Sequence, residues 1–295
     1  MSAGVGLRRN RRGYRERYGR RRYGTSRGAR KPAGAGALNA VARLGLVARG
    51  VVYVIIGVIA VMMALGISRH SSDSAGAIEA IATKPFGYLL LWILVIGFLG
   101  LAVWRFVQAA VKRLNATEGH RIKAFLYGVA YTILFFSTLM FVVHGRQPTG
   151  SNAAARDYTA RVLSHDGGQL LVAIVGVVLV VLGIVMAIRG FSAEFTRELR
   201  MGWMSNSTQN AVVRLGQAGY VARGAVVAGI GIAAVDAAIA YKAARAEGVD
   251  GVLRSFAQTD FGPWLLILIA LGLIAFGVLS FFEAKWRRTL GGIPV

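Results

Sequence analysis

Residues 44–66 read LGLVARGVVYVIIGVIAVMMALG, an apolar run in which Arg49 is the single charged side chain. A helix needs about 20 predominantly apolar residues to cross the hydrocarbon core of a bilayer. A helix on the surface of a soluble core keeps one polar face, which this run lacks. The run therefore predicts a transmembrane helix.

Five further segments have the same character, and together the six predict an all-α, polytopic membrane protein. The predicted spans cover about 44–66, 87–111, 122–143, 168–190, 216–241 and 261–282. Only 16% of the 295 residues are charged and 55% are hydrophobic, whereas about 25% of a soluble domain is charged. Cysteine is absent, which excludes disulfides, thiolate metal sites and a cysteine nucleophile.

The first span shares its motif with the fifth. GLVARGVV at 45–52 aligns with GYVARGAV at 219–226. The segments that follow also align, GAIEAIATKPFG at 76–87 with GVLRSFAQTDFG at 251–262. These matches predict tandem copies of a unit with two long helices, joined by a loop that carries a short amphipathic helix.

A middle copy completes the series in a diverged form. Tyr127 stands where Arg49 and Arg223 stand in the other copies, and Tyr131 stands where Tyr53 stands. Each unit contains an even number of spans, so all copies insert in the same direction. We predict three parallel helical hairpins in an approximately threefold arrangement.

The repeats also set the predicted domain boundaries. Repeats at 40–115, 120–190 and 211–288 are flanked by a basic tail at 1–39, an amphipathic segment at 191–210 and a C-terminal tail at 289–295. Small residues such as Gly176, Gly183 and Gly224 should let the helices approach closely, as is common between transmembrane helices.

The motifs resemble those of a bacterial family of unknown function, DUF1206. The starts GLVARGVVY and GYVARGAVV and the entries PFG and DFGPW carry the resemblance. It covers about 40–288, and Tyr127 departs from the motif. The resemblance implies three copies of a two-span unit and a place in the bacterial cell membrane, and it implies no activity.

Lysine and arginine are concentrated in residues 1–31, between spans two and three, between spans four and five, and after span six. Cytoplasmic flanks carry such an excess, so both termini are predicted to be cytoplasmic. The arginine-rich tail predicts a disordered segment that contacts anionic lipid headgroups. Contact with RNA or DNA is the less favoured interpretation, and a misassigned start codon is a third.

Ionisable residues inside spans are candidate functional sites. They are Arg49, Arg105, Arg223, Asp236 and Glu283. Arg49 and Arg223 either anchor at headgroup level or turn inward to hold loop carbonyls or an anion. We expect Glu283 to pair with Arg223, and Arg105 to be an interface anchor. Asp236 has no basic neighbour in sequence, and either faces water or accepts a proton or cation.

One further segment has a regular pattern. Phe191, Phe195, Leu199 and Trp203 follow the fourth span at four-residue spacing, with charged residues between them. The pattern predicts an amphipathic helix along the inner membrane interface. Docking of a protein partner is the alternative role for this segment.

Catalytic signatures such as HExxH, a Walker A loop and GxSxG are absent, and the four histidines are scattered. We therefore predict no enzyme activity, metal site or cofactor. A membrane interaction or scaffold protein, with a membrane or cytoplasmic protein as partner, is the favoured hypothesis. The alternative is a transporter or channel for a small solute, ion or lipid, which the pseudosymmetric repeats and few buried charges favour.

Overall fold

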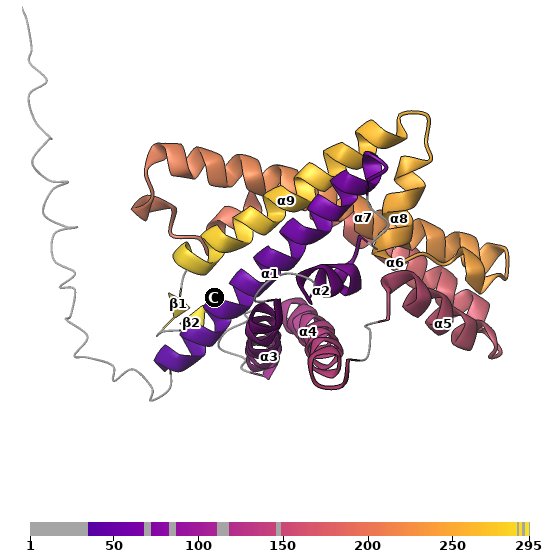
Figure 1. Ribbon diagram of the computed structural model, residues 1–295, viewed down its shortest axis with the longest axis horizontal. Helices are drawn as coiled ribbons and strands as arrows, with labels where there is room; N and C mark the ends of the chain where they lie inside the picture. Colours follow the sequence, from indigo (N-terminus) through magenta and orange to yellow (C-terminus); the bar gives the residue numbers. More distant parts are fainter. Residues whose placement is uncertain are drawn as a thin grey trace, which may run out of the picture. The chain divides into compact units, whose positions relative to one another are not determined.

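The computed structural model describes residues 35–67, 72–82, 87–110, 118–145, 149–287, 289–290 and 293–294 (Figure 1). Nearly all of these residues are helical, and six helices are long and apolar enough to cross a membrane. The predicted all-α class with six spans is therefore confirmed. Of the predicted basic tail, 1–39, residues 1–34 lie outside the described residues, and 35–39 belong to the first helix.

Each repeat contains two long helices with a short helix between them. The long helices are α1 (Ala35–Ala64), α3 (Gly87–Ala110), α4 (Glu118–His144), α6 (Gly168–Phe191), α7 (Asn206–Ile239) and α9 (Gly262–Trp286). The short helices, one in each repeat, are α2 (Ser74–Ala82), α5 (Ser151–Leu163) and α8 (Val249–Ala257). Near the C-terminus, β1 (Thr289–Leu290) pairs antiparallel with β2 (Ile293–Pro294).

The fifth long helix begins earlier than predicted. α7 starts at Asn206 instead of near position 216, because Ser205 caps it: its Oγ accepts a hydrogen bond from the backbone N–H of Thr208 at 3.3 Å. Serine is a preferred residue at this position, since it satisfies one of the N–H groups that a helix start leaves free.

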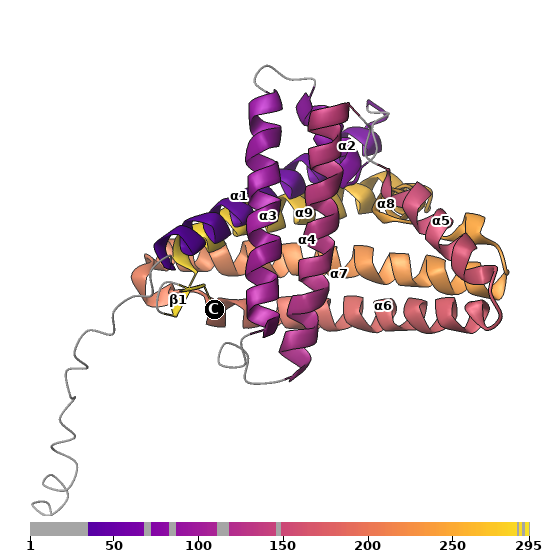
Figure 2. The same ribbon diagram turned by 90° about the horizontal axis from the view of Figure 1, so that it is seen from below.

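The second long helix of each repeat packs mainly against the first long helix of another repeat. α3 packs against α4, α6 against α7, and α9 against α1. The last of these pairs joins the third repeat to the first, so the order of contacts is cyclic, in agreement with a threefold arrangement. Figure 2 shows the α3–α4 pair running across the direction of α6 and α7, so the pairs are inclined to one another.

The middle repeat does not form the predicted hairpin. α1 contacts α3 and α7 contacts α9, whereas among the described residues α4 makes little or no contact with α6. The buried sides of α4 and α6 face the neighbouring repeats. Much of the remaining surface of α6 is apolar and exposed, including Leu170, Ile174 and Ile184, as suits a helix in contact with lipid.

Glycine brings the paired helices together, as predicted from the sequence. A Cβ added at Gly183 of α6 would lie 2.6 Å from the carbonyl oxygen of Gly224 in α7. At the equivalent place in the next pair, a Cβ at Gly277 of α9 would lie 2.7 Å from the carbonyl oxygen of Gly50 in α1. Close approach of this kind gives transmembrane helices their packing contacts.

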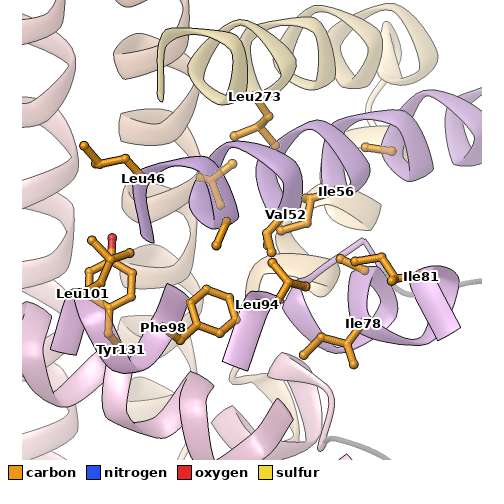
Figure 3. Packing of buried hydrophobic residues seen from close by; sticks show 14 of the residues in the cluster. Leu46, Val52, Ile56, Ile78, Ile81, Leu94, Phe98, Leu101, Tyr131 and Leu273 are labelled. Carbon is orange, nitrogen blue, oxygen red and sulfur yellow. The ribbon is translucent and has the colours of Figure 1, made fainter. Parts of the chain in front are cut away.

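The largest core cluster surrounds the middle of α1. Figure 3 shows Val52 and Ile56 of α1 facing Leu94 and Phe98 of α3, with Leu273 of α9 on the other side of α1. All five side chains are buried. The core thus joins the first and third repeats through α1.

The predicted amphipathic helix after α6 is wrong. α6 ends at Phe191, and two short 3-10 helices follow, η2 (Glu194–Glu198) and η3 (Met201–Trp203). The chain turns at Ala193, whose φ of 52° lies in the left-handed region, which ends a right-handed helix. The four aromatic and leucine side chains therefore do not share one helix face.

The burial of these side chains follows the turn. Phe195 is 8% and Leu199 1% exposed, whereas Phe191 is 74% and Trp203 83% exposed. Phe195 lies directly against the backbone of Gly216 in α7, where a Cβ would have no room. The centre of this segment is thus part of the protein core, and only its ends present aromatic side chains.

Candidate functional site

A cavity of about 430 Å³ lies where the first long helices of the three repeats meet. Each helix lines it with the same four positions, spaced i, i+3, i+4 and i+7. These positions are Arg49, Val52, Tyr53 and Ile56 in α1, Tyr127, Ala130, Tyr131 and Leu134 in α4, and Arg223, Val226, Val227 and Ile230 in α7. That spacing marks one face of an α-helix, so the three repeats present the same face to one shared space.

The second long helices contribute less evenly. Phe98 of α3 and Leu273 of α9 occupy equivalent positions and both line the cavity. Leu179 of α6 is their equivalent in the middle repeat, and it is not among the lining residues. Within the described part of the chain, the middle repeat therefore supplies no second-helix wall, in keeping with the separation of α4 from α6.

The N-termini of the short helices line one end of the cavity, here called the cap end. Asp73 and Ser74 belong to the start of α2, Ser151 to the start of α5, and Val249 to the start of α8. The first turns of all three short helices thus meet over the same space. Helix starts carry free N–H groups that need acceptors.

A cyclic set of hydrogen bonds supplies those acceptors. Asp73, Asn152 and Asp250, which we call the cap ring, each accept a backbone N–H from the start of another short helix. Asp73 accepts from the N–H of Ser151, and Asp250 accepts from the N–H of Ser72. Asn152 accepts from the N–H groups of Gly248 and Gly251, and all four distances lie between 2.6 and 2.9 Å. The repeats are thereby tied together in a closed circuit. One feature of the sequence could have indicated this set, since Asp and Asn are preferred at helix starts.

Arg49 lies at the other end of the cavity, the arginine end, and is bound within the protein. It is 7% exposed, forms an ion pair with Glu283, and donates from Nε to the Oγ of Ser280 at 3.1 Å. Its guanidinium carbon also lies 5.1 Å from the ring centroid of Phe276. All three partners belong to α9, so Arg49 joins the first repeat to the third.

The predicted partner of Glu283, Arg223, is therefore wrong. α9 packs between α1 and α7, and the Glu283 carboxylate pairs with the arginine of α1. Sequence reasoning assigned the acid to the arginine of its own repeat. The structure assigns it to the equivalent arginine, Arg49, of another repeat.

Arg223 faces the cavity among aromatic rings. Its guanidinium carbon lies 5.0 Å from the ring centroid of Phe276, 5.6 Å from that of Tyr53 and 5.9 Å from that of Tyr127. No hydrogen bond or ion pair of Arg223 occurs within the described residues. Of the two interpretations of Arg223, the inward orientation is the one that agrees with this geometry.

Repeat equivalence explains the difference between the two arginines. Glu283 of α9 faces Arg49 of α1, and the position on α6 that corresponds to Glu283 carries Arg189. Arg189 is exposed and pairs with Glu194 at 3.6 Å. The helix that packs against α7 therefore offers Arg223 no carboxylate at the position where α1 receives one.

The equivalent contact between α3 and α4 has no charge at the position that corresponds to Glu283, and it has an arginine one turn away. Gln108 of α3 corresponds to Glu283, and Tyr127 of α4 corresponds to Arg49. Arg105 donates to Oε1 of Gln108 at 3.0 Å, and its guanidinium carbon lies 5.1 Å from the ring centroid of Tyr127. Arg105 thus packs inside the protein and is not the predicted interface anchor.

Asp236 takes no part in the cavity. It is exposed, and Arg245 of η4 (Ala243–Arg245) donates to its two carboxylate oxygens at 2.9 and 3.2 Å. The interpretation that Asp236 faces water agrees with this exposure, and its basic partner comes from nine positions further on, because the chain turns after α7. An exposed pair of this kind contributes little to stability.

The helices and their repeats define the class of the protein, a multi-pass membrane protein built from three two-helix units. The chain belongs to the family described as Domain of Unknown Function (DUF1206), which matches it three times, over residues 44–112, 122–193 and 218–287. The resemblance found in the sequence is thus confirmed. The chain is also 31% identical over 255 residues to the uncharacterized protein YxxB of Bacillus subtilis (strain 168), covering 83% of this chain and 90% of that protein. No solved structure matches it.

Proposed function

We propose that this protein binds a small molecule in the central cavity and carries it within or across the bacterial cell membrane. The observation that supports the proposal most directly is the lining of the cavity by the same four positions of all three repeats. Transporters built from repeats bind their substrates at the interface between the repeats. In the proposed membrane topology both termini are cytoplasmic, and the basic tail contacts anionic lipid.

The size and lining of the cavity suit a ligand. Ligand pockets range over about 300–1,000 Å³ and combine mostly apolar walls with a few polar groups. At about 430 Å³ the cavity falls in this range. Its arginines and tyrosines line one end, Asp73 and the hydroxyl residues Ser74, Thr149 and Ser151 line the other, and valine, isoleucine and leucine lie between them.

A scaffold function has less support than the sequence suggested. Its docking surface was predicted on the segment 191–203, whose central residues Phe195 and Leu199 are buried. The exposed aromatic side chains of Phe191 and Trp203 favour it as the second candidate. Such a partner would contact the ends of the segment and not a continuous helix face.

Filling the cavity tests the proposal. Val226→Phe places a larger side chain in the cavity, and Ile232→Phe on the same helix is the matched control, because Ile232 is 62% exposed. Native mass spectrometry of protein extracted gently from its own membrane should show a small molecule on the wild type and on I232F, and none on V226F. A bare wild-type chain, or a ligand retained on a folded V226F variant, would contradict the proposal.

A further inference from the structure

We infer that the ligand of the cavity is an anion with an apolar body, and that its carboxylate or phosphate group binds Arg223. This inference rests on the proposed function, and it adds the chemical class of the ligand and the residue that recognises its charge. It follows from the contacts of Arg223, from the equivalent arginine Arg49, and from the apolar wall beyond them.

The first observation is a cation without a counter-ion at the wall of the cavity. A guanidinium carries five N–H donors and no acceptor. Arg223 has no carboxylate, hydroxyl or carbonyl partner within the described residues, and three aromatic rings surround it at 5.0 to 5.9 Å. Aromatic faces attract a cation, but they provide no lone pair for its N–H groups. A bound anion would supply those acceptors.

The second observation is the internal comparison with Arg49. In the first repeat the same position is neutralised by Glu283 and hydrogen-bonded to Ser280. On α6 the two equivalent positions carry Arg189 and Met186, neither of which can accept a hydrogen bond from Arg223 as a carboxylate would. The described part of the protein thus contains an acceptor for one arginine and lacks it for the other, which is the place that a bound anion would fill.

The third observation concerns the rest of the ligand. Beyond the arginines the helices present Val52, Ala130 and Val226, and one turn further Ile56, Leu134 and Ile230. This wall suits an aliphatic or aromatic body. A volume of about 430 Å³ is near the low end for ligand pockets, which favours a single chain or ring over a lipid with two long chains.

The chemistry fits two sources, a single-chain lipid acid that enters from the bilayer and a water-soluble aromatic acid. Binding is measured by calorimetry on the full chain in phosphatidylcholine nanodiscs, with decanoate for the first source and 3-phenylpropionate for the second. Decanol and decyltrimethylammonium are the neutral and cationic probes matched to decanoate. At least one acid should bind the wild type about tenfold more tightly than decanol, the least expected of a charge-assisted hydrogen bond.

The variants assign that preference to one residue. Arg223→Gln should reduce the affinity for the acid about tenfold or more while leaving decanol unchanged. Arg223→Lys should retain part of the affinity for the acid. Arg214→Gln is the matched control, because Arg214 is an exposed arginine of the same helix. The acid that binds identifies the source.

Two kinds of failure are distinguishable. If decanol binds as tightly as either acid and V226F abolishes binding, the cavity binds ligands but the anionic class is wrong. An acid affinity unchanged in folded R223Q, or tighter binding of decyltrimethylammonium, also overturns the inference. If no probe binds the wild type, or V226F has no effect on any probe, the proposed function fails with it.

Discussion

Arg49 in the first repeat and Glu283 in the third form a buried ion pair across 234 residues of sequence. The pair lies in the contact between α1 and α9, which closes the cyclic order of the helices. Its counterpart in the contact between α6 and α7 would join Arg189 and Arg223, two like charges; Arg189 pairs instead with Glu194, and Arg223 lies among aromatic rings. One internal pair and one cavity-facing arginine thus arise from the same repeated position.

Neutralising the acid should destabilise the protein. Glu283→Gln leaves Arg49 buried without its counter-charge, and breaking a buried pair from one side costs about 3–5 kcal/mol. Chemical unfolding in mixed micelles measures the free energy of unfolding. Glu194→Gln is the control, because the exposed pair of Glu194 with Arg189 is worth about 1 kcal/mol or less. Equal losses in the two variants would contradict a structural role for the Arg49 pair.

The two equivalent arginines should respond differently to the same substitution. Arg49→Gln removes the main partner of Glu283, so we expect a loss of about 3 kcal/mol. Arg223→Gln removes only ring contacts and relieves an unpaired charge, so the change should stay within about 1 kcal/mol. Thermal unfolding of the ligand-free protein compares them. Greater destabilisation by R223Q would show that Arg223 has an internal partner.

The cap ring should protect the backbone N–H groups at the starts of the short helices from exchange with solvent. Asp250→Ala removes the acceptor of the Ser72 N–H, and loss of a helix cap costs about 0.5–2 kcal/mol. Hydrogen exchange at the Ser72 N–H should be faster in D250A than in the wild type. The control, Asp260→Ala at an exposed loop aspartate, should leave exchange at Ser72 unchanged. If D250A leaves exchange at Ser72 unchanged, the ring does not hold α2.

The approach of α6 to α7 should depend on glycine. Gly183→Leu must displace the carbonyl of Gly224 and the N–H of Ala228, each 2.6 Å from the added Cβ, and overpacking costs about 1–3 kcal/mol. Nothing lies within 4 Å of a Cβ at Gly202, so Gly202→Leu should be tolerated. The unfolding midpoints in detergent distinguish them. A wild-type midpoint for G183L would mean that the two helices separate freely.

The segment after α6 should behave as core at its centre and as surface at its ends. Phe195→Ala removes a buried ring beside Gly216, and such truncations cost about 3–5 kcal/mol. Trp203→Ala alters an 83% exposed side chain and should cost less than about 1 kcal/mol. The free energies of unfolding compare the two. A larger loss of stability in W203A than in F195A would contradict this description of the segment.

Four-residue spacing misled the prediction for this segment for a physical reason. Periodicity reports which side chains could share a face if the backbone were a continuous helix. It does not report whether the helix continues past Phe191. The turn at Ala193 and the packing of Phe195 on Gly216 depend on α7, which begins earlier than its apolar residues indicate.

The number of long helices, their approximate limits, the repeats and the equivalence of Arg49 with Tyr127 and Arg223 could all be predicted from the sequence alone. These properties are local, because each spanning helix satisfies its own backbone hydrogen bonds and must match the thickness of the bilayer. The sequence also placed Arg49, Arg223 and Glu283 at similar depth. Their partners remained open because depth alone does not say which helices are neighbours.

Tertiary packing determines which arginine receives the acid and which one faces the cavity. The ion pair joins Glu283 of α9 to Arg49 of α1, 234 residues apart in sequence, and it forms only where these two helices pack together. The cavity likewise exists only where three helix faces from different repeats come together. Side-chain partners across such contacts depend on helix packing, which no single segment of the sequence specifies.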